Sequence, residues 1–338
     1  MLPDVVGISI RNIHIYDKVL NELIFPLKYL VDTIKIIKKT KWNIPIIAGG
    51  AGFSMYPRQF MTEAPEIKYG IFLEGEEFFP QLLDNLDSPY NVKGIFIRDK
   101  NEIVFTGDRS FVNFENSIIP DRTFIPFDNC KKGNYSLGVQ SKRGCSLQCF
   151  YCSYPYLNGS KLKLRDPKDI VAEIEELCYI HGVTEFAFAD NVFNIPASHA
   201  EKICKEIIKR GINVNWIAWF NEQFMDERFV DLCLEAGCRL FEFSPDGFSN
   251  KSLRWLRKNI QTCHIQNTYN IARKKNMEVS YNFIIGIPGQ GPISLIRQTI
   301  FILKAKIFLG KKLKRIQFSK LGIEPSTALA KLAIEEKK

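Results

Sequence analysis

The sequence predicts an α/β fold with parallel sheets, and three observations lead to this expectation. Short apolar runs alternate with amphipathic stretches of helical length along most of the 338 residues, which is the pattern of repeated β-α units. The alternation occurs in two series, separated by a stretch rich in proline, aspartate and asparagine. The length is about twice that of a typical domain, and 46% apolar residues can fill two cores. We therefore expect two α/β domains joined by a linker.

The first series predicts three strands with helices between them, closed by a hairpin. Strands are expected over 5–10, 44–48 and 69–73, a helix over 20–40, a glycine-rich loop over 49–57 and a short helix after that loop. The hairpin is expected over 94–98 and 103–105, because Asp99, Lys100 and Asn101 are turn formers between two apolar runs.

The second series predicts six strands with helices between them. Strands are expected over 135–141, 184–189, 213–220, 239–244, 278–285 and 315–320, and helices over 167–181, 197–210, 227–236, 251–276 and 293–309. The stretch between the two series, 112–134, is expected to be an ordered linker. The expected domains are therefore 1–111 and 135–338.

Three cysteines spaced C-x3-C-x2-C carry the strongest chemical signal. Cys145, Cys149 and Cys152 supply three thiols within eight residues. A cluster of four irons normally takes four protein thiolates, so three clustered cysteines leave one iron open for chemistry. Phe150 and Tyr151, next to the last cysteine, could shield such a cluster from water and tune its potential.

Two other interpretations of the cysteines are a structural zinc site and a disulfide framework. A structural zinc site needs four ligands, yet the nearest downstream histidine, His181, is 29 positions after Cys152 and no second cysteine pair lies close by. Nine cysteines is an odd number, and no secretory segment opens the chain, so a disulfide framework is not expected. The remaining cysteines are scattered and are expected to be core residues; they are Cys130, Cys178, Cys204, Cys233, Cys238 and Cys263.

The run "SKRGCSLQCFYC" resembles the signature of the radical S-adenosylmethionine (SAM) superfamily. The resemblance implies a 4Fe-4S cluster on the three cysteines, with SAM bound at the open iron and cleaved by one electron to a 5'-deoxyadenosyl radical. The six predicted strands match the partial (β/α)6 barrel of this superfamily, so 135–338 is expected to be the radical SAM core, incomplete at its carboxyl end.

Active-site residues of such a fold are expected at the carboxyl ends of the strands. By the resemblance, polar residues after the second strand are expected to meet the amino group of SAM, carboxylates after the fourth strand the ribose, and backbone of the fifth-strand loop the adenine. These candidates are Asp190, Asn191 and Asn194; Glu242, Ser244 and Asp246; and Gly286 and Pro288. Asn194 could instead cap a helix. Arg143 and Arg165 could face the SAM carboxylate or form surface ion pairs, and no catalytic residue is assigned.

The segments "GISI", "AGGAGFSMYP" and "LEGEEFFP" are similar to the later part of a cobalamin (vitamin B12)-binding, Rossmann-like domain. Residues 1–111 are therefore expected to form such a domain, incomplete at its amino terminus. The expected contacts are Ser9, Gly49, Gly50, Glu74 and Gly75, which follow strands where ligands bind in open α/β sheets. The glycines could equally serve only to turn the chain. His14 is more simply a surface residue than a cobalt ligand.

Charge and hydropathy narrow the expected partners. The formal net charge is +9, but the lysines are spread along helices and concentrate only at 35–41 and 311–315. A nucleic-acid partner is therefore not expected. No run approaches 18 uncharged apolar residues, so no membrane span is expected and a cytoplasmic location follows.

The expected function is radical SAM chemistry on a small-molecule or peptide substrate. With cobalamin, the resemblance points to methyl transfer to an unactivated carbon, and it implies a flavodoxin- or ferredoxin-type electron donor. Three alternatives stay open: hydrogen abstraction with rearrangement, RNA modification without cobalamin, and an iron-sulfur binding or partner protein without turnover.

Overall fold

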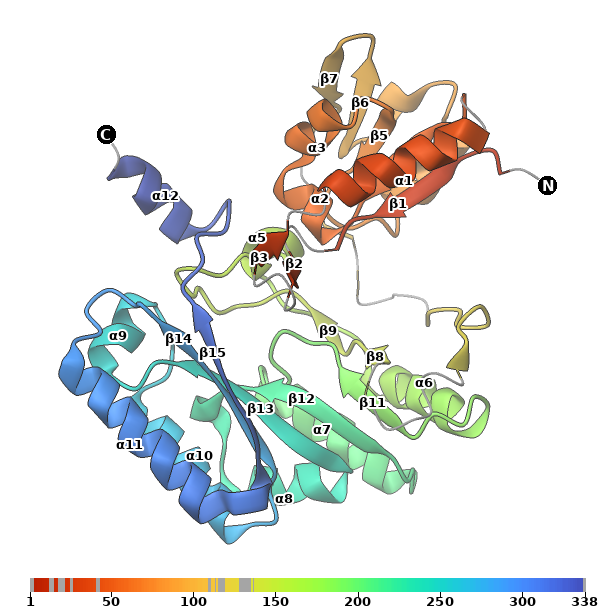
Figure 1. The fold of residues 1–338 in the computed structure, drawn as a ribbon. Coiled ribbons are helices and arrows are strands. Elements are labelled where there is room, and N and C mark those ends of the chain that lie inside the picture. The colour runs from red at the N-terminus through yellow and green to blue at the C-terminus, as the bar shows by residue number, and fades with distance from the viewer. Residues whose placement is uncertain are drawn as a thin grey trace. The chain divides into compact units, whose positions relative to one another are not determined.

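The computed structural model divides the chain into two compact units (Figure 1). The described residues are 3–11, 15–17, 22–24, 27–40, 43–108, 111–112, 114, 119–127, 135 and 137–336. The units are Met1–Val112 with Tyr156–Asn158, and Asn113–Pro155 with Gly159–Lys338. The functional domains 1–111 and 135–338 stay predictions. Most of the predicted linker 112–134 lies outside the described residues, as do His14 and Cys130.

The first unit contains a five-stranded mixed sheet in the order β1-β4-β5-β6-β7. The first three strands are parallel, and β6 and β7 form the predicted antiparallel hairpin. The strands are β1 Val6–Ser9, β4 Ile46–Gly49, β5 Ile67–Ile71, β6 Ile95–Asp99 and β7 Glu102–Phe105; the helices are α1 Leu27–Thr40, α2 Ala51–Met55, α3 Pro57–Glu63, α4 Phe78–Asp84 and the 3-10 turn η1 Pro89–Asn91.

Helices cover both faces of this sheet because consecutive strand residues point to opposite sides. Ile46 packs in the cluster that contains Ile34 of α1, whereas Ile47 packs in the cluster that contains Leu82 of α4. This arrangement, with three parallel strands of a mixed sheet between helices, is Rossmann-like, as predicted. One detail differs: β2 Ile15–Asp17 and β3 Glu22–Ile24 form a small antiparallel hairpin, so the expected helix over 20–40 begins only at Leu27.

The second unit contains a six-stranded sheet in the order β15-β14-β13-β12-β11-β8, with all neighbours parallel. Each strand follows its neighbour in the chain, which is the arrangement of the predicted partial (β/α)6 barrel. The strands are β8 Gly138–Val139, β11 Glu185–Phe188, β12 Asn215–Phe220, β13 Cys238–Asp246, β14 Val279–Ile285 and β15 Leu313–Lys320. A separate short ladder pairs β9 Lys142–Arg143 with β10 Lys163–Leu164.

Helices pack against one face of this sheet (Figure 1). They are α6 Pro167–Tyr179, α7 Ala197–Lys209, α8 Glu227–Glu235, α9 Asn250–Trp255, α10 Thr262–Lys274 and α11 Pro292–Leu309, with 3-10 turns η3 Glu222–Phe224 and η4 Gly310–Lys312. Two further helices, α5 Tyr154–Asn158 and α12 Ala328–Glu335, do not belong to this layer. Trp216, Phe241 and Tyr281 of the sheet join Phe229 and Phe301 of the helices in one large core. The opposite face of the strands is free to carry polar groups.

Local capping fixes where several of these helices begin. The Asp166 carboxylate accepts the N–H of Lys168 at the start of α6, and the Asp226 carboxylate accepts the N–H of Phe229 at the start of α8. Pro167 at the first position of α6 has the φ that a helix start requires. These caps explain why both helices begin where the sequence predicts.

The expected single helix over 251–276 is wrong. The chain forms α9 and α10 with a break between them. At the break, Arg257 has a φ of 53°, which no helix continues through. The Leu256 carbonyl accepts the N–H of Phe150 from the cysteine loop. A tertiary hydrogen bond thus replaces a helical one.

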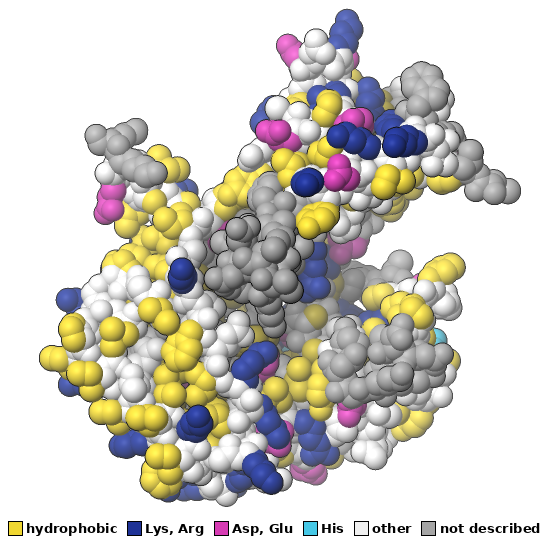
Figure 2. All heavy atoms as spheres, in the orientation of Figure 1, with side chains coloured by type: hydrophobic (Ala, Val, Ile, Leu, Met, Phe, Trp, Pro, Cys, Tyr) yellow, Lys and Arg dark blue, Asp and Glu magenta, His cyan; other side chains and the backbone are white. Residues whose placement is uncertain are grey.

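Two surface features bear on partners. No described helix combines the length and the apolar composition needed to cross a membrane. On the face drawn in Figure 2, the Lys and Arg side chains are scattered rather than gathered in one patch.

Candidate functional site

The three-cysteine segment is a tight loop that leaves β9 and returns through α5 to β10. Gly144 opens it with a φ of 93°, and a Cβ there would lie 2.0 Å from the Lys161 carbonyl oxygen. Only glycine fits this approach. The N–H of Cys145 donates to the Gly159 carbonyl at 3.0 Å, and the N–H of Cys152 donates to the Cys149 carbonyl at 3.1 Å. Backbone contacts therefore hold the loop closed.

The three thiols of this loop are free, and their chemistry fits an iron-sulfur cluster. Cys145 is buried and Cys149 and Cys152 are half-buried, with no disulfide. Burial raises the pKa of each thiol, to about 12 for Cys152, and the neighbouring thiols raise the pKa of Cys149 and Cys152 further. Among the described residues, no three His, Cys, Asp or Glu side chains form a ready metal-binding group. Because burial disfavours the charged thiolates, the three cysteines can ionise together only when a metal cation binds them.

Aromatic side chains pack beside the loop, and their expected role as a shield stays a prediction. The Phe150 ring meets the Trp255 ring edge to face at 5.1 Å between centroids. The guanidinium of Arg257 lies 4.7 Å from the Phe150 centroid, a cation-π contact. These groups come from α9 and from the break after it, so the unexpected break contributes directly to the site.

A buried charge pair lies under the cysteine loop. Asp246, at the end of β13, accepts hydrogen bonds from Tyr151 at 2.6 Å and from Ser244 at 2.9 Å, and its carboxylate lies 2.8 Å from the Lys258 ammonium. Burial would lower the pKa of Lys258, but Asp246 and the other acidic groups around the ammonium together outweigh burial and hold the pKa well above its usual value. The pair therefore stays charged and fixes Tyr151 between two of the cysteines.

Glu222 is a buried carboxyl group near this charge pair. It is the second residue after β12, following Asn221. It is 2% exposed, and its Oε1 has no hydrogen-bond partner among the described residues. Burial raises the pKa of Glu222 to about 7, although the Lys258 charge counteracts it. A neutral carboxylic acid here can donate a hydrogen bond at neutral pH.

Removing this carboxyl should change the pH dependence of stability. Between pH 4.5 and 7 the folded state keeps a proton on Glu222 that the unfolded state has lost, so the free energy of unfolding falls as pH rises. In the wild type, the free energy of unfolding should decline by up to about 3 kcal/mol over this pH range because of Glu222, and Glu222→Gln should remove that decline. Urea unfolding at a series of pH values measures this. Glu235→Gln, exposed on α8, is the control, and a wild-type slope in Glu222→Gln would contradict the assignment.

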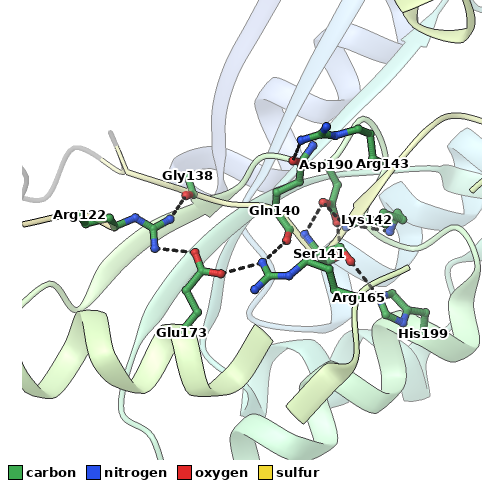
Figure 3. A network of polar contacts seen from close by, with 10 residues as sticks. All are labelled: Arg122, Gly138, Gln140, Ser141, Lys142, Arg143, Arg165, Glu173, Asp190 and His199. Carbon is green, nitrogen blue, oxygen red and sulfur yellow. Dashed lines mark hydrogen bonds and ion pairs between the residues drawn. The ribbon is translucent and has the colours of Figure 1, made fainter. Parts of the chain in front are cut away.

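Asp190 lies at the centre of a buried polar network (Figure 3). Its Oδ1 accepts the backbone N–H groups of Ser141 and Lys142 at 2.8 and 3.2 Å, and its Oδ2 accepts the Ser141 hydroxyl and lies 3.4 Å from the Lys142 ammonium. That ammonium also donates to the Phe193 carbonyl at 2.6 Å. Burial lowers the pKa of His199, beside the Ser141 carbonyl. Asp190 thus anchors the strand that leads to the cysteines, and contact with SAM would require this network to open.

A second buried ionic group holds β8 and the residue after it, just before the segment that Asp190 binds (Figure 3). The Glu173 carboxylate on α6 is 2.5 Å from the Arg122 guanidinium and 2.7 Å from that of Arg165. The two arginines also donate to the carbonyls of Gly138 and Gln140 at 2.9 and 2.7 Å. Arg165 is therefore neither a surface ion pair nor, in this arrangement, open to a ligand carboxylate.

Of the predicted asparagines, one lies near the cysteine loop. The Asn191 amide donates to the Gly144 carbonyl at 3.4 Å and lines a small cavity with Cys145. Asn194 is fully buried and exchanges two hydrogen bonds with the backbone of Asn221. It joins two strand ends and does not cap a helix.

The remaining predicted SAM contacts, apart from Ser244 and Asp246, lie at two different places. Glu242 is deeper in the sheet than Asp246 and its carboxylate pairs with Arg315 at 2.8 Å. Gly286 and Pro288 are exposed after β14, with the N–H of Gly286 donating to the Gln290 side chain at 3.2 Å. All of these contacts stay predictions.

In the first unit, the predicted cobalamin contacts meet at one edge of the sheet. Ser9 ends β1, Gly49 ends β4, and Gly50 follows with a φ of 95°, where a Cβ would lie 2.7 Å from the Ile10 carbonyl oxygen. Glu74 follows β5, and its carboxylate accepts the N–H of Val112 at 2.6 Å. The edge is thus built largely from backbone, and its role stays a prediction.

Sequence reasoning missed Lys258 and the Arg122-Glu173 pair. Lys258 lies inside the expected helix over 251–276, and nothing in the sequence there indicates that the helix breaks and that Lys258 is buried. Arg122 and Glu173 lie 51 positions apart and carry no motif. Only the fold brings them together.

Comparison with known proteins identifies the second unit. The family model described as the radical SAM superfamily matches residues 139–296. This match contains the cysteine loop, the buried charge pair and the fifth-strand loop. This part of the chain therefore matches the radical SAM superfamily. The match implies a 4Fe-4S cluster and SAM as cofactors.

Relatives of the radical SAM domain extend the likeness over most of the chain. An uncharacterized methyltransferase of Pyrococcus horikoshii is 26% identical, covering 85% of this chain and 61% of the relative. The anaerobic magnesium-protoporphyrin IX monomethyl ester cyclase of Cereibacter sphaeroides is 28% identical, covering 81% and 47%. The chain therefore spans about half to three-fifths of these relatives.

A solved structure shows the same fold across both units. The radical SAM methyltransferase TsrM of Kitasatospora setae, determined with cobalamin and a 4Fe-4S cluster bound, gives a TM-score of 0.84 at 20% identity, covering 99% of this chain and 67% of that one. The cobalamin-dependent radical SAM enzyme OxsB gives 0.73 at 16% identity, covering 99% and 52%. The predicted fold class is confirmed.

Proposed function

We propose that the chain is a cobalamin-dependent radical SAM enzyme that transfers a methyl group to an unactivated carbon of a small molecule or peptide. The observation that carries the proposal is the loop of three free, dry thiols beside a parallel six-stranded sheet. Relatives named methyltransferases support the reaction type, and the fold of the first unit supports cobalamin.

In this proposal, Cys145, Cys149 and Cys152 hold the 4Fe-4S cluster. Bound there, the cluster supplies the electron that cleaves SAM to a 5'-deoxyadenosyl radical. Phe150 and Trp255 keep water from the loop, and Lys258 places a positive charge near the three sulfurs. A nearby cation raises the affinity of the site for electrons, whereas the exclusion of water lowers it, because reduction adds negative charge.

Other residues of the domain position SAM in this proposal. Asn191, beside Cys145, offers an amide to the amino group, and the edge that carries Ser244 and Asp246 offers acceptors to the ribose. The exposed backbone of Gly286 and Pro288 lies against the adenine. Asp190 and Asn194 act by fixing strand ends, because both are buried in hydrogen bonds.

Cobalamin would bind at the strand edge of the first unit. Ser9, Gly49, Gly50, Glu74 and Gly75 surround this edge, and residues without bulky side chains leave room for a large flat ligand. The corresponding domains are 1–111 and 135–338, with 112–134 as linker. A flavodoxin- or ferredoxin-type protein would donate the electron, in the cytoplasm.

Anaerobic reconstitution with iron and sulfide tests the proposal. With dithionite and SAM, the reconstituted chain should form 5'-deoxyadenosine, and it should retain cobalamin on gel filtration, measured by absorbance. A stable cluster without 5'-deoxyadenosine would support an iron-sulfur binding protein instead. Product formation without cobalamin retention would favour hydrogen abstraction and rearrangement.

A further inference from the structure

A pocket outside the proposed SAM contacts lies where α9, α10 and α11 begin. Its volume is about 450 Å³, within the range of small-molecule sites. It is lined by Phe248, Ser249, Asn250, Lys251, Thr262, Gly289, Gly291, Ile293, Ser294 and Arg297. In Figure 1, α9 lies beside the amino-terminal end of α11. The lining contains two cations, three hydroxyl groups and no acidic residue.

The amino terminus of α11 opens into this pocket without a cap. This helix has 18 residues, its N-cap is Gly291, no side chain caps it, and its first turn carries no acidic residue. The first N–H groups of a helix have no partner within the helix, and the helix dipole places partial positive charge there. Pro292 at the first position removes one donor, so the next N–H groups are left to bind an anion.

Ser294 gives a second, independent indication of a ligand. Its side chain is 9% exposed, and its hydroxyl has no hydrogen-bond partner among the described residues. Buried hydroxyls nearly always have a partner. Ser294 lines the pocket from the first turn of α11, so a ligand in the pocket would supply the missing partner.

The two cationic side chains that line the pocket are also available to a ligand. Within the described part of the chain, neither Lys251 nor Arg297 forms an ion pair. The Lys251 stem is held over Gly289, where a Cβ would lie 3.3 Å from its Cε. Arg297 lies one turn beyond Ser294 on the same helix. Two positive charges and an open helix terminus match a dianion.

The walls of the pocket are held in place by the chain itself. The Gln290 side chain accepts the N–H groups of Gly286 and Ile287 at 3.2 and 3.4 Å and donates to Gln298 of α11 at 3.2 Å. The Asn250 side chain accepts the N–H of Thr262 at 2.9 Å, which joins α9 to α10. These bonds fix the pocket before any ligand binds, so little ordering cost is added.

We propose that this pocket binds a phosphate group, carried by a small molecule or free in solution. A phosphate monoester has a charge near −2 at neutral pH, equal and opposite to that of Lys251 and Arg297. The N–H groups of α11 and the Ser294 hydroxyl would donate to its oxygens. Phe248 and the exposed Ile293 form the apolar part of the lining, where an organic group would lie. This site goes beyond the proposed radical chemistry and does not depend on it.

Isothermal titration of the full chain tests the proposal without cluster or SAM. The probes are AMP, inorganic phosphate and adenosine. We expect AMP and phosphate to bind at one site and adenosine not to bind. Tighter binding of AMP would identify a phosphate ester as the ligand, and equal binding would identify free phosphate. Absence of binding by both at millimolar concentration would overturn the proposal, as would displacement of either by SAM.

Matched variants locate the binding. Arg297→Gln and Lys251→Gln should each weaken phosphate binding about tenfold, since each removes a charge-assisted hydrogen bond. Ser294→Ala should weaken binding as well, without lowering the urea midpoint, because its hydroxyl has no partner to lose. Lys304→Gln, exposed further along α11, is the charge-matched control. Unchanged binding in both cation variants would place the phosphate elsewhere and overturn the assignment.

Discussion

Alanine at Cys149 should abolish SAM cleavage and most iron binding. The loop offers three thiols, and removing the middle one leaves two donors for a cluster that needs three from the protein. We expect 5'-deoxyadenosine under dithionite to fall by at least about 100-fold, because loss even of groups that only support a metal ligand costs 10 to 100-fold. Iron content and 5'-deoxyadenosine are measured on the same anaerobic preparation.

The matched control is Cys263→Ala. This thiol is exposed on α10 and is also free, so the chemical change is identical but lies outside the loop. Iron content and product should stay at wild-type values. Full product formation by Cys149→Ala would refute the assignment of the three cysteines, whereas loss in both variants would point to general damage.

The order of strands and helices could be predicted because it depends on local patterns. β12 shows this most clearly: Trp216, Ala218 and Phe220 are buried and the residues between them are half-buried, which is the alternation that the sequence displays. The hairpin of β6 and β7 was predictable for a similar reason, because turn-forming residues separate two apolar runs. Lys100 lies in the turn of this hairpin and adopts a φ of 50°.

The errors occurred where distant contacts override local preference. Residues 251–276 have helical composition throughout, yet the chain breaks after Leu256, whose carbonyl binds Phe150 of the cysteine loop. The break lets Lys258 reach Asp246 at 2.8 Å. No local pattern encodes the bond between Phe150 and Leu256, which lie more than 100 residues apart. The break was therefore invisible in the sequence, and so was the charge pair that depends on it.

In the candidate site too, the residues close together in the sequence could be predicted, and the contacts between distant residues could not. The three cysteines could be predicted because all of them lie within eight residues. Asp190 was found by its place after a strand, but its partners Ser141 and Lys142 lie about 50 positions earlier, and they enclose it. A position at a strand end therefore indicates proximity to the site, and it does not specify whether a side chain faces a ligand or supports the strand.

Removing Glu173 should cause the largest loss of stability among single changes to the ionic groups. Its side chain is 1% exposed and pairs with Arg122 and Arg165, themselves 8% and 4% exposed. Glu173→Ala would leave two buried guanidinium groups without a counter-charge, which costs about 3–5 kcal/mol of unfolding free energy. Urea unfolding measures this. Arg228→Ala is the control, because the Arg228 side chain is 64% exposed in its 2.5 Å pair with Glu201, and ion pairs of exposed side chains contribute about 1 kcal/mol or less.

A triple variant of the same ionic group tests whether it only stabilises the fold or also positions the cysteine loop. If the cost arises from unpaired charge, replacing all three residues by apolar ones of similar size should recover much of it, as for other buried ionic triads. Arg122→Met, Glu173→Leu and Arg165→Met combined should therefore unfold at a higher urea concentration than Glu173→Ala alone. The triple variant still loses the bonds from Arg122 and Arg165 to the Gly138 and Gln140 carbonyls, which hold the strand before the cysteines. We therefore expect it to recover stability but to bind less iron than the wild type. Full recovery of iron binding would mean that the ionic group only stabilises the fold and does not position the cysteine loop.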